Sequence, residues 1–177
     1  PAARGFYERM GYSVFATLRD QPAGHERWWL ARRDPRPGDD GGFETHAARH
    51  PAAAAVIAQG LGAVGDALLG PDPRRQALAI TADDDAGAQG GLWMVVRRDW
   101  LFLDLFILHP AARRGGIGGR ILAMAEEVAR ARGCRGVWLD SFGFQAPGFY
   151  RRHGYEVFGE LPDHPIGHGR FFLRKVF

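Results

Sequence analysis

Apolar and polar positions alternate in the second half of the chain at spacings that predict strands interleaved with helices. Two alternating runs, 76–82 and 92–97, flank a turn rich in Asp and Gly and predict a pair of strands. The run 100–108 is almost continuously apolar, which favours a central strand buried on both faces. Apolar residues between 117 and 128 then recur at helical spacing and predict an amphipathic helix.

The remaining pattern completes a mixed sheet. Gly133 is placed to end the helix, and residues 136–142 predict another buried strand. A short helix is expected around 145–153, followed by a hairpin formed by 155–161 and 170–176. This alternation predicts an α/β (α+β) fold with a mixed sheet and flanking helices.

The first third of the chain carries weaker signals. Residues 34–42 are rich in Pro, Gly and Asp and predict a linker. Residues 43–46 can form a short strand. Residues 50–69 carry apolar side chains at helical spacing, but three internal glycines predict a weak or broken helix.

A duplication determines the domain organisation. Residues 3–30 align with residues 146–173 without a gap at an offset of 143, and sixteen of the 28 paired positions are identical, where ordinary composition gives about two. An offset of this length corresponds to a whole domain. We therefore expect residues 1–33 to be the closing helix and hairpin of a preceding domain, and residues 43–177 to be a complete domain.

Composition excludes several classes of protein. With 177 residues, 46% of them hydrophobic, the chain can bury one core, and no run approaches the roughly 18 apolar residues that cross a membrane. The net charge of +3 is too small to predict nucleic-acid binding. Cys134 is the single cysteine, so no internal disulfide forms and a reducing cytoplasm is expected. No metal site is predicted.

A glycine-rich segment, HPAARRGGIGGR at 109–120, joins the central strand to the amphipathic helix. Glycine lets a ligand approach the backbone, and amides that open a helix favour an anion such as a diphosphate. The segment has neither the spacing of a dinucleotide-binding fingerprint nor the Gly-Lys-Ser/Thr of a phosphate-binding P-loop. A tight turn without a ligand is the alternative.

With this segment the chain resembles the GNAT superfamily of acetyl-CoA-dependent N-acetyltransferases, over about residues 43–177. The superfamily's Arg/Gln-x-x-Gly-x-Gly/Ala loop is matched by residues 113–118, and its Ala-x-x-Phe-Tyr-x-x-x-Gly-Phe/Tyr signature by residues 146–155. The chain is also similar to a bacterial subgroup that ends in QAPGFY…GYEVFGEL…GH…FLRK. The resemblance implies a twisted mixed sheet that is splayed at its centre, where coenzyme A enters.

The resemblance also implies roles for individual residues. Tyr150 matches the tyrosine that protonates the departing thiolate, a role suited to a positioned phenol; a purely structural tyrosine is the alternative. The end of the central strand is expected to pair with the pantetheine arm, and the loop is expected to hold the diphosphate. The strand residues are Phe106, Ile107 and Leu108; the loop residues are Arg113, Arg114, Gly115, Gly116, Ile117, Gly118 and Gly119.

Two carboxylates are candidates for the remaining chemistry. Strand alternation places Phe102, Asp104 and Phe106 on one face, and Asp104 is a candidate base for the attacking amine. Family members often carry their acidic residue two positions earlier, where this chain has Phe102, so Asp104 is not a strict match to the family pattern. A structural salt bridge to an arginine is the alternative role for Asp104. Asp140, in the next strand, is a candidate ligand for the ammonium group of the acceptor.

The sequence therefore predicts an N-acetyltransferase that passes acetyl from acetyl-CoA directly to an amine, with a small molecule as the expected acceptor. The alternative is a catalytically silent coenzyme-A-binding or interaction module of a tandem acetyltransferase. Residues 1–33 are expected to lie against the sheet of the complete domain or to be exchanged with another chain in a homodimer.

Overall fold

The computed structural model describes residues 2–19, 26–31, 51–84 and 87–177. The chain divides into two units, one formed by residues 1–31 and 74–177 and the other by residues 32–73. The expected linker and the expected short strand at 43–46 lie outside the described residues.

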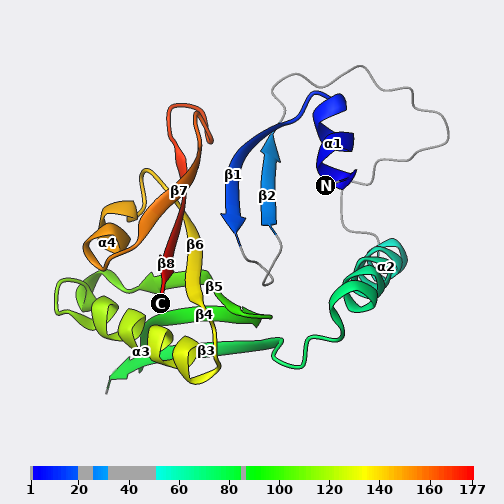
Figure 1. The fold of residues 1–177 in the computed structure, drawn as a ribbon. Coiled ribbons are helices and arrows are strands. Elements are labelled where there is room, and N and C mark those ends of the chain that lie inside the picture. Colours follow the sequence, from blue (N-terminus) through cyan, green and yellow to red (C-terminus); the bar gives the residue numbers. More distant parts are fainter. Residues whose placement is uncertain (1, 20–25, 32–50, 85–86) are drawn as a thin grey trace. The chain divides into compact units, whose positions relative to one another are not determined.

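The helices and strands of the first unit lie close to the ranges that the sequence predicts (Figure 1). Its helices are α1 (Ala2–Arg9), α3 (Ile117–Ala131) and α4 (Pro147–Arg152). Its strands are β1 (Ser13–Arg19), β2 (Glu26–Ala31), β3 (Gln76–Asp84), β4 (Gly87–Arg97), β5 (Trp100–Leu108), β6 (Gly136–Phe142), β7 (Glu156–Leu161) and β8 (Arg170–Val176).

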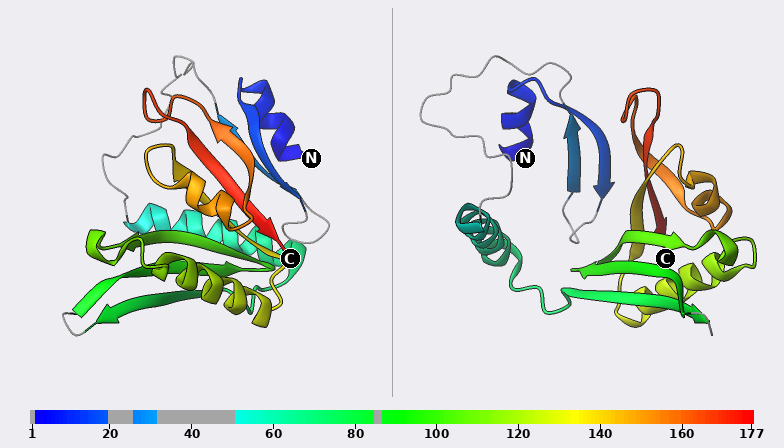
Figure 2. Two further views of the ribbon diagram at one scale, coloured as in Figure 1. Left: turned by 90° about the vertical axis from the view of Figure 1, so that its left-hand side faces the viewer. Right: turned by 180° about the vertical axis from the view of Figure 1, so that it is seen from behind.

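These strands form one eight-stranded sheet in the order β2-β1-β7-β8-β6-β5-β4-β3. Every described pair of neighbours is antiparallel except β5 and β6, which are parallel and are joined through α3. The predicted mixed sheet is confirmed. Figure 2 shows that β3–β5 and β6–β8 run in clearly different directions, so the sheet is strongly twisted at the β5–β6 junction.

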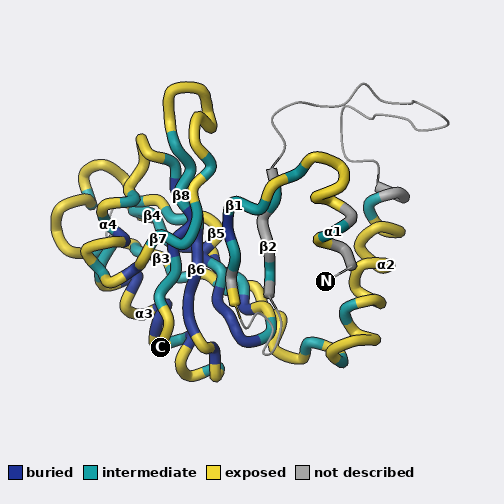
Figure 3. The backbone as a smooth tube through the Cα atoms, turned by 45° about the horizontal axis from the view of Figure 1, so that its top comes forward, coloured by how far each residue is buried: buried dark blue, intermediate teal, exposed yellow. Residues whose placement is uncertain are grey.

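The main core lies between the sheet and α3. The buried face of α3 presents Ile121, Leu122, Ala125 and Ala129, which pack on apolar side chains of β4, β5, β6 and β8. This face has the helical spacing that the sequence predicts. Figure 3 shows the buried residues concentrated in these central elements. Cys134 belongs to this core and is buried.

A partly buried ionic contact lies next to this core. The Lys175 ammonium lies 2.9 and 2.8 Å from the two carboxylate oxygens of Glu126, and Arg130 lies 3.6 Å from one of them. Burial, reinforced by Glu126, raises the pKa of the neighbouring Tyr155 phenol. The pair therefore attaches the last strand, β8, to α3.

The opposite face of the sheet carries a second, aromatic cluster. Trp100, Trp138 and Phe172 are buried there, and aromatic side chains from β1, β5 and β7 pack against them. The cluster includes Phe15 of β1, whose ring centroid lies 5.2 Å from that of Phe172. The N-terminal hairpin thus covers part of this face.

The second unit contains α2 (Pro51–Leu69), a continuous helix of 19 residues. The expectation of a weak or broken helix here is wrong, because Gly60 and Gly62 both lie within the helix. Its apolar residues are exposed, at positions Val56, Ile57, Leu61, Val64 and Leu68. No helix in the described ranges is both long enough and apolar enough to span a membrane.

Candidate active site

The parallel strands β5 and β6 separate after three residue pairs. Trp100, Leu101 and Phe102 are paired with residues 136–138, but no further pair joins the two strands. Beyond this point β5 continues beside β4 and β6 continues beside β8. One edge of the outer half of β5 is therefore left without a strand partner in the described part of the chain, and the sheet is splayed at its centre.

A β-bulge at Asp104 coincides with this separation. Leu103 is paired with Met94 and Leu105 with Trp93, which leaves Asp104 as the extra residue. A bulge of one residue reverses the faces of every later side chain. Phe102 accordingly packs in the aromatic cluster, whereas Phe106 packs on the main core.

Two sequence expectations about β5 are therefore wrong. Phe102, Asp104 and Phe106 do not share a face, since the bulge interrupts the alternation. The strand is also not buried on both faces along its whole length, because Leu105 and Ile107 are largely exposed.

The backbone of the outer half of β5 offers hydrogen-bonding groups to the split. His109 N donates to Gln89 O at 2.7 Å, and Leu108 and Ile107 follow in antiparallel register with Gly90 and Gly91. Main-chain groups alternate between the two sides of such a strand. Those of Ile107 therefore point toward β4, and those of Phe106 and Leu108 point toward the split.

This geometry refines the expected pantetheine site. Within the described residues, Phe106 and the Leu108 amide have no strand partner on the open side. The Leu108 carbonyl accepts a hydrogen bond from Arg113 Nε at 3.0 Å. An extended ligand could pair with Phe106 and Leu108, but not with the backbone of Ile107, which is directed to β4.

The loop after β5 ends in a run of unpartnered amides. A single 3₁₀ turn at Pro110–Ala112 leads to Arg113, and Gly116 caps the N-terminus of α3 without any side-chain hydrogen bond. Among the described contacts, none involves the main-chain N–H groups of residues 114–119. Six consecutive free donors at the positive end of a 15-residue helix form a site suited to an anion.

The glycines of this loop differ in what surrounds them. Gly116 has a φ of 77°, in the left-handed region that favours glycine, and a Cβ atom at Gly115 or Gly116 would meet nothing within 4 Å. The backbone is therefore open to a ligand at both positions. Gly118 instead faces inward, where a Cβ atom would lie 3.5 Å from the Phe149 ring.

Tyr150 lies on α4 and is 8% exposed within the main core. Burial, and secondarily the Asp140 carboxylate, raises the pKa of its phenol to about 12. The hydroxyl has no hydrogen-bond partner in the described residues, and it is not one of the fully buried unpartnered polar atoms. The phenol is thus protonated at neutral pH and able to donate to a ligand.

The two candidate carboxylates have different environments. Asp104 is exposed at the bulge and forms no ion pair within the described ranges. Asp140 is partly buried, and both Nε and Nη2 of Arg170 lie 2.7 Å from its Oδ2 atom. Asp104 thus has no cationic partner among the described residues, whereas Asp140 already has one, Arg170, and an ammonium group of the acceptor would compete with it.

Sequence reasoning missed His153, at the end of α4. Its Nδ1 atom lies 2.9 Å from the Phe149 carbonyl, which can only accept, so Nδ1 carries the proton. The Nε2 atom would lie 3.0 Å from a Cβ atom placed on Gly119. The imidazole therefore occupies the space that a side chain at Gly119 would fill, beside the free amides. The signature leaves this position unspecified, so the sequence offered no signal for it.

An aromatic cluster at the end of β6 was also missed. The rings of Phe142 and Phe144 stack with centroids 5.3 Å apart, and His168 approaches Phe144 edge-on at 5.1 Å. His164 lies 6.0 Å from Phe142, and Phe144 is 57% exposed. The alternation of Phe142 and Phe144 marks this surface in the sequence. No group of His, Cys, Asp and Glu that could hold a metal ion occurs in the described ranges.

Comparison with known proteins shows which family the chain resembles. Residues 75–157 match the family described as "Acetyltransferase (GNAT) domain". The chain is 35% identical to "Acetyltransferase Atu2258" of Agrobacterium fabrum over 111 residues, which are 63% of this chain and 81% of that protein. It is 44% identical to "Blasticidin-S acetyltransferase" of Streptomyces morookaense over 79 residues, which are 44% of this chain and 58% of that protein.

A solved structure shows the same fold. The crystal structure of a putative acetyltransferase from Agrobacterium tumefaciens superposes with a TM-score of 0.71 at 33% identity, and the match covers 77% of this chain and 99% of that one.

Proposed function

Since the chain belongs to the GNAT acetyltransferase family, we propose that it transfers acetyl from acetyl-CoA to the nitrogen of a small-molecule amine. The observation that carries this proposal is the continuity of two binding elements. The unpaired edge of β5 leads, through one 3₁₀ turn, to the six free amides at the start of α3. An extended thioester with a diphosphate needs these two elements in this order.

The coenzyme would be held by backbone groups. The amides of residues 114–119 would bind the diphosphate, aided by the dipole of α3. Phe106 and Leu108 would pair with the pantetheine arm as an added strand does. His153 would donate a hydrogen bond to the diphosphate as the imidazolium, because its Nε2 atom lies beside Gly119 and Nδ1 already donates to the Phe149 carbonyl.

The reaction forms a C–N bond between the acetyl carbon and the amine and breaks the C–S bond of the thioester. Tyr150 would donate its phenolic proton to the departing thiolate, in keeping with a pKa of about 12 that keeps it protonated. Asp104 would accept the proton lost by the amine, directly or through water. No covalent enzyme intermediate is needed, and the buried Cys134 takes no part.

The acceptor would approach the end of β6. A relative named blasticidin-S acetyltransferase supports a small-molecule acceptor. Phe142, Phe144 and the flanking His164 and His168 offer aromatic faces to a planar or cationic group. Asp140 would contribute negative charge here only by sharing it with Arg170.

Titration calorimetry with coenzyme A tests the proposed site. Gly116→Asp should lower affinity by about 100-fold, because its carboxylate repels a diphosphate and competes for the amides. The position is open, and Asp tolerates a left-handed φ, so the fold should persist. Gly116→Asn is the matched control and should lose much less affinity.

Activity is tested by the release of free thiol from acetyl-CoA in the presence of a panel of amines. The proposal expects at least one amine to accelerate release, and mass spectrometry to find it heavier by one acetyl group. Wild-type protein that does not bind coenzyme A would overturn the proposed site. Binding without turnover on any amine would favour a silent coenzyme-A-binding module.

A further inference from the structure

The two copies of the duplicated segment have the same local structure. Gly11 and Gly154 end their helices with φ values of 83° and 85°. Each glycine is followed by a tyrosine whose ring meets the tyrosine of its helix edge-on, at 5.8 Å in the first copy and 5.9 Å in the second. The duplication is therefore preserved in three dimensions.

The hairpins of the two copies also share a register. In the first copy Val14 is paired with Leu30 and Ala16 with Trp29, which leaves a bulge at Phe15. In the second, the equivalent bulge falls at Phe158, between pairs formed by residues 157 and 159. Two hairpins with identical register and bulge present the same outer edge.

These outer edges meet each other at equivalent positions. β1 is antiparallel to β7, and the paired residues are Ala16 and Gly159, whose numbers differ by the repeat offset of 143. The strand order β2-β1-β7-β8 is correspondingly symmetric. Contact between equivalent surfaces at equivalent positions is the pattern of a two-fold, isologous interface.

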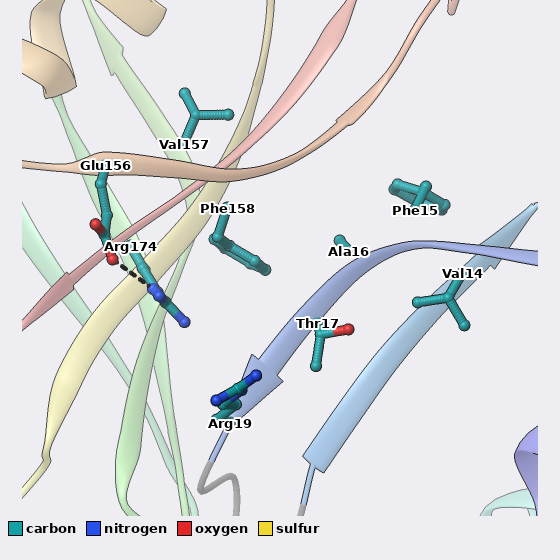
Figure 4. Close-up of a pocket in the computed structure, with 9 residues that line it drawn as sticks. All are labelled: Val14, Phe15, Ala16, Thr17, Arg19, Glu156, Val157, Phe158 and Arg174. Carbon is teal, nitrogen blue, oxygen red and sulfur yellow. Dashed lines mark hydrogen bonds and ion pairs between the residues drawn. The ribbon is translucent and has the colours of Figure 1, made fainter.

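The side chains along the β1–β7 junction, called the seam below, agree with this two-fold relation. A Cβ atom on Gly159 would collide with the Cβ atom of Ala16, so only one methyl group fits at the axis. Phe15 and Phe158 are equivalent, and their rings lie 5.2 and 6.3 Å from Phe172. A cavity of about 540 Å³ lies along the β1–β7 edge, and Phe15 and Phe158 both line it. Figure 4 shows these two side chains beside the strands.

The hairpin also makes contacts beyond the seam. The Arg27 guanidinium of β2 lies 5.5 Å from the centre of the Trp138 ring. Its pKa is lowered by burial and, to a lesser extent, by Arg97. A cation held in a partly desolvated position over a core tryptophan is typical of an interface.

We propose that the outer edge of β7 is a docking surface for the equivalent hairpin of a neighbouring repeat. Two acetyltransferase domains then lie side by side about a two-fold axis through positions 16 and 159, with one continuous sheet across the junction. In this chain β1 and β2 provide the neighbouring hairpin. The occupant is another copy of the same segment, because the register pairs equivalent residues. The inference does not depend on acetyl transfer.

Hydrogen exchange of the full chain, followed for peptides spanning β7, tests the proposal. Ala16→Asp places an unpaired charge at a 3% exposed position in the seam and should accelerate exchange in β7 by about tenfold. Ser13→Asp, at an exposed position of the same strand, is the matched control and should leave β7 unchanged. Light scattering shows whether the docked hairpin comes from the same chain or from a second one.

A methyl swap tests the symmetry itself without adding charge. Gly159→Ala should accelerate exchange in β7, since two methyl groups then meet at the axis. The double variant Ala16→Gly/Gly159→Ala should restore wild-type exchange, because it moves the single methyl group to the equivalent position. If Ala16→Asp leaves β7 protected, or if the double variant exchanges as fast as Gly159→Ala, the proposed interface is wrong.

Discussion

The two copies of the duplicated segment have the same local geometry in very different surroundings. Tyr150 of the second copy is 8% exposed, whereas the equivalent Tyr7 is 44% exposed. Tyr155 is buried and Tyr12 is only half-buried. The second copy packs against the core that α3 covers, whereas the first copy meets the domain mainly through β1, which pairs with β7.

The difference separates what a segment encodes from what its environment supplies. Both copies share the glycine that ends the helix, the contact between the two tyrosine rings, the hairpin register and the bulge. These features therefore follow from the local sequence. Burial of the helix tyrosine occurs only in the second copy, where α3 is present, and there it raises the pKa of Tyr150. The role proposed for Tyr150 therefore depends on the local motif together with the neighbouring helix α3.

The largest expected difference between the copies comes from removing the hydroxyl of the helix tyrosine, Tyr150 in the second copy and Tyr7 in the first. Tyr150→Phe should lower turnover by roughly 10²–10⁴-fold, because the thiolate loses its general acid. Tyr7→Phe should leave turnover unchanged. Initial rates with acetyl-CoA and an identified amine measure both, and calorimetry should find coenzyme A affinity unchanged in both variants. Equal turnover in the two variants would show that Tyr150 is structural.

The ion pair that attaches β8 to α3 offers the next largest effect. Lys175→Met should lower the free energy of unfolding by about 2 kcal/mol, less than the roughly 3–5 kcal/mol typical of a fully buried pair, because Arg130 remains near Glu126. Urea unfolding measures the loss. Glu126→Leu combined with Lys175→Met should recover most of it, since no unpaired charge remains. A double variant that is less stable than Lys175→Met would contradict this account.

Local periodicity was enough to predict most of this fold. The apolar spacing located α3, and the signature around Tyr150 located α4 and the hairpin that follows it. The glycine-rich loop was placed correctly because strand, turn and helix signals occur in sequence at residues 100–131. Each of these features depends on residues close together in the chain.

What the sequence did not predict depends on long-range contacts. Asp104 becomes a bulge because β4 and β5 differ by one residue in register, and no local pattern at 100–108 encodes that. The bulge then determines which side chains of β5 reach the core. The sequence did not indicate a role for His153, because its proximity to Gly119 arises only when α4 folds against the start of α3. Interior glycines did not break α2, because their individual propensity costs of about 1 kcal/mol are small over 19 residues.

His153 differs between the copies, since Met10 occupies the equivalent position. His153→Met should raise the KM for acetyl-CoA by about tenfold, the expected cost of one hydrogen bond to a charged group. The kcat should change little. Acetylpantetheine, which lacks the diphosphate, should show no change in KM. Met10→His is the reciprocal control and should leave both substrates unaffected.

A structural role for His153 would give a different pattern. If it only packs against α3, His153→Met should affect acetyl-CoA and acetylpantetheine equally. His153→Gln should recover part of the affinity in the binding account, because its amide can still donate a hydrogen bond near Gly119.

The smallest expected effect concerns the glycines that end the two helices. Gly154→Ala should lower stability by about 1 kcal/mol, a shift of roughly 2–4 °C in Tm, because alanine is strained at a φ of 85°. No collision contributes, since the nearest atom to the added methyl group would be Lys175 Cε at 3.6 Å. Gly11→Ala has the same local strain at 83° but should shift the main transition less. The reason is that α1, with its exposed Tyr7, can open without exposing the main core. Differential scanning calorimetry measures both shifts. Equal shifts would show that the first copy unfolds together with the domain, and that α1 is as firmly held as α4.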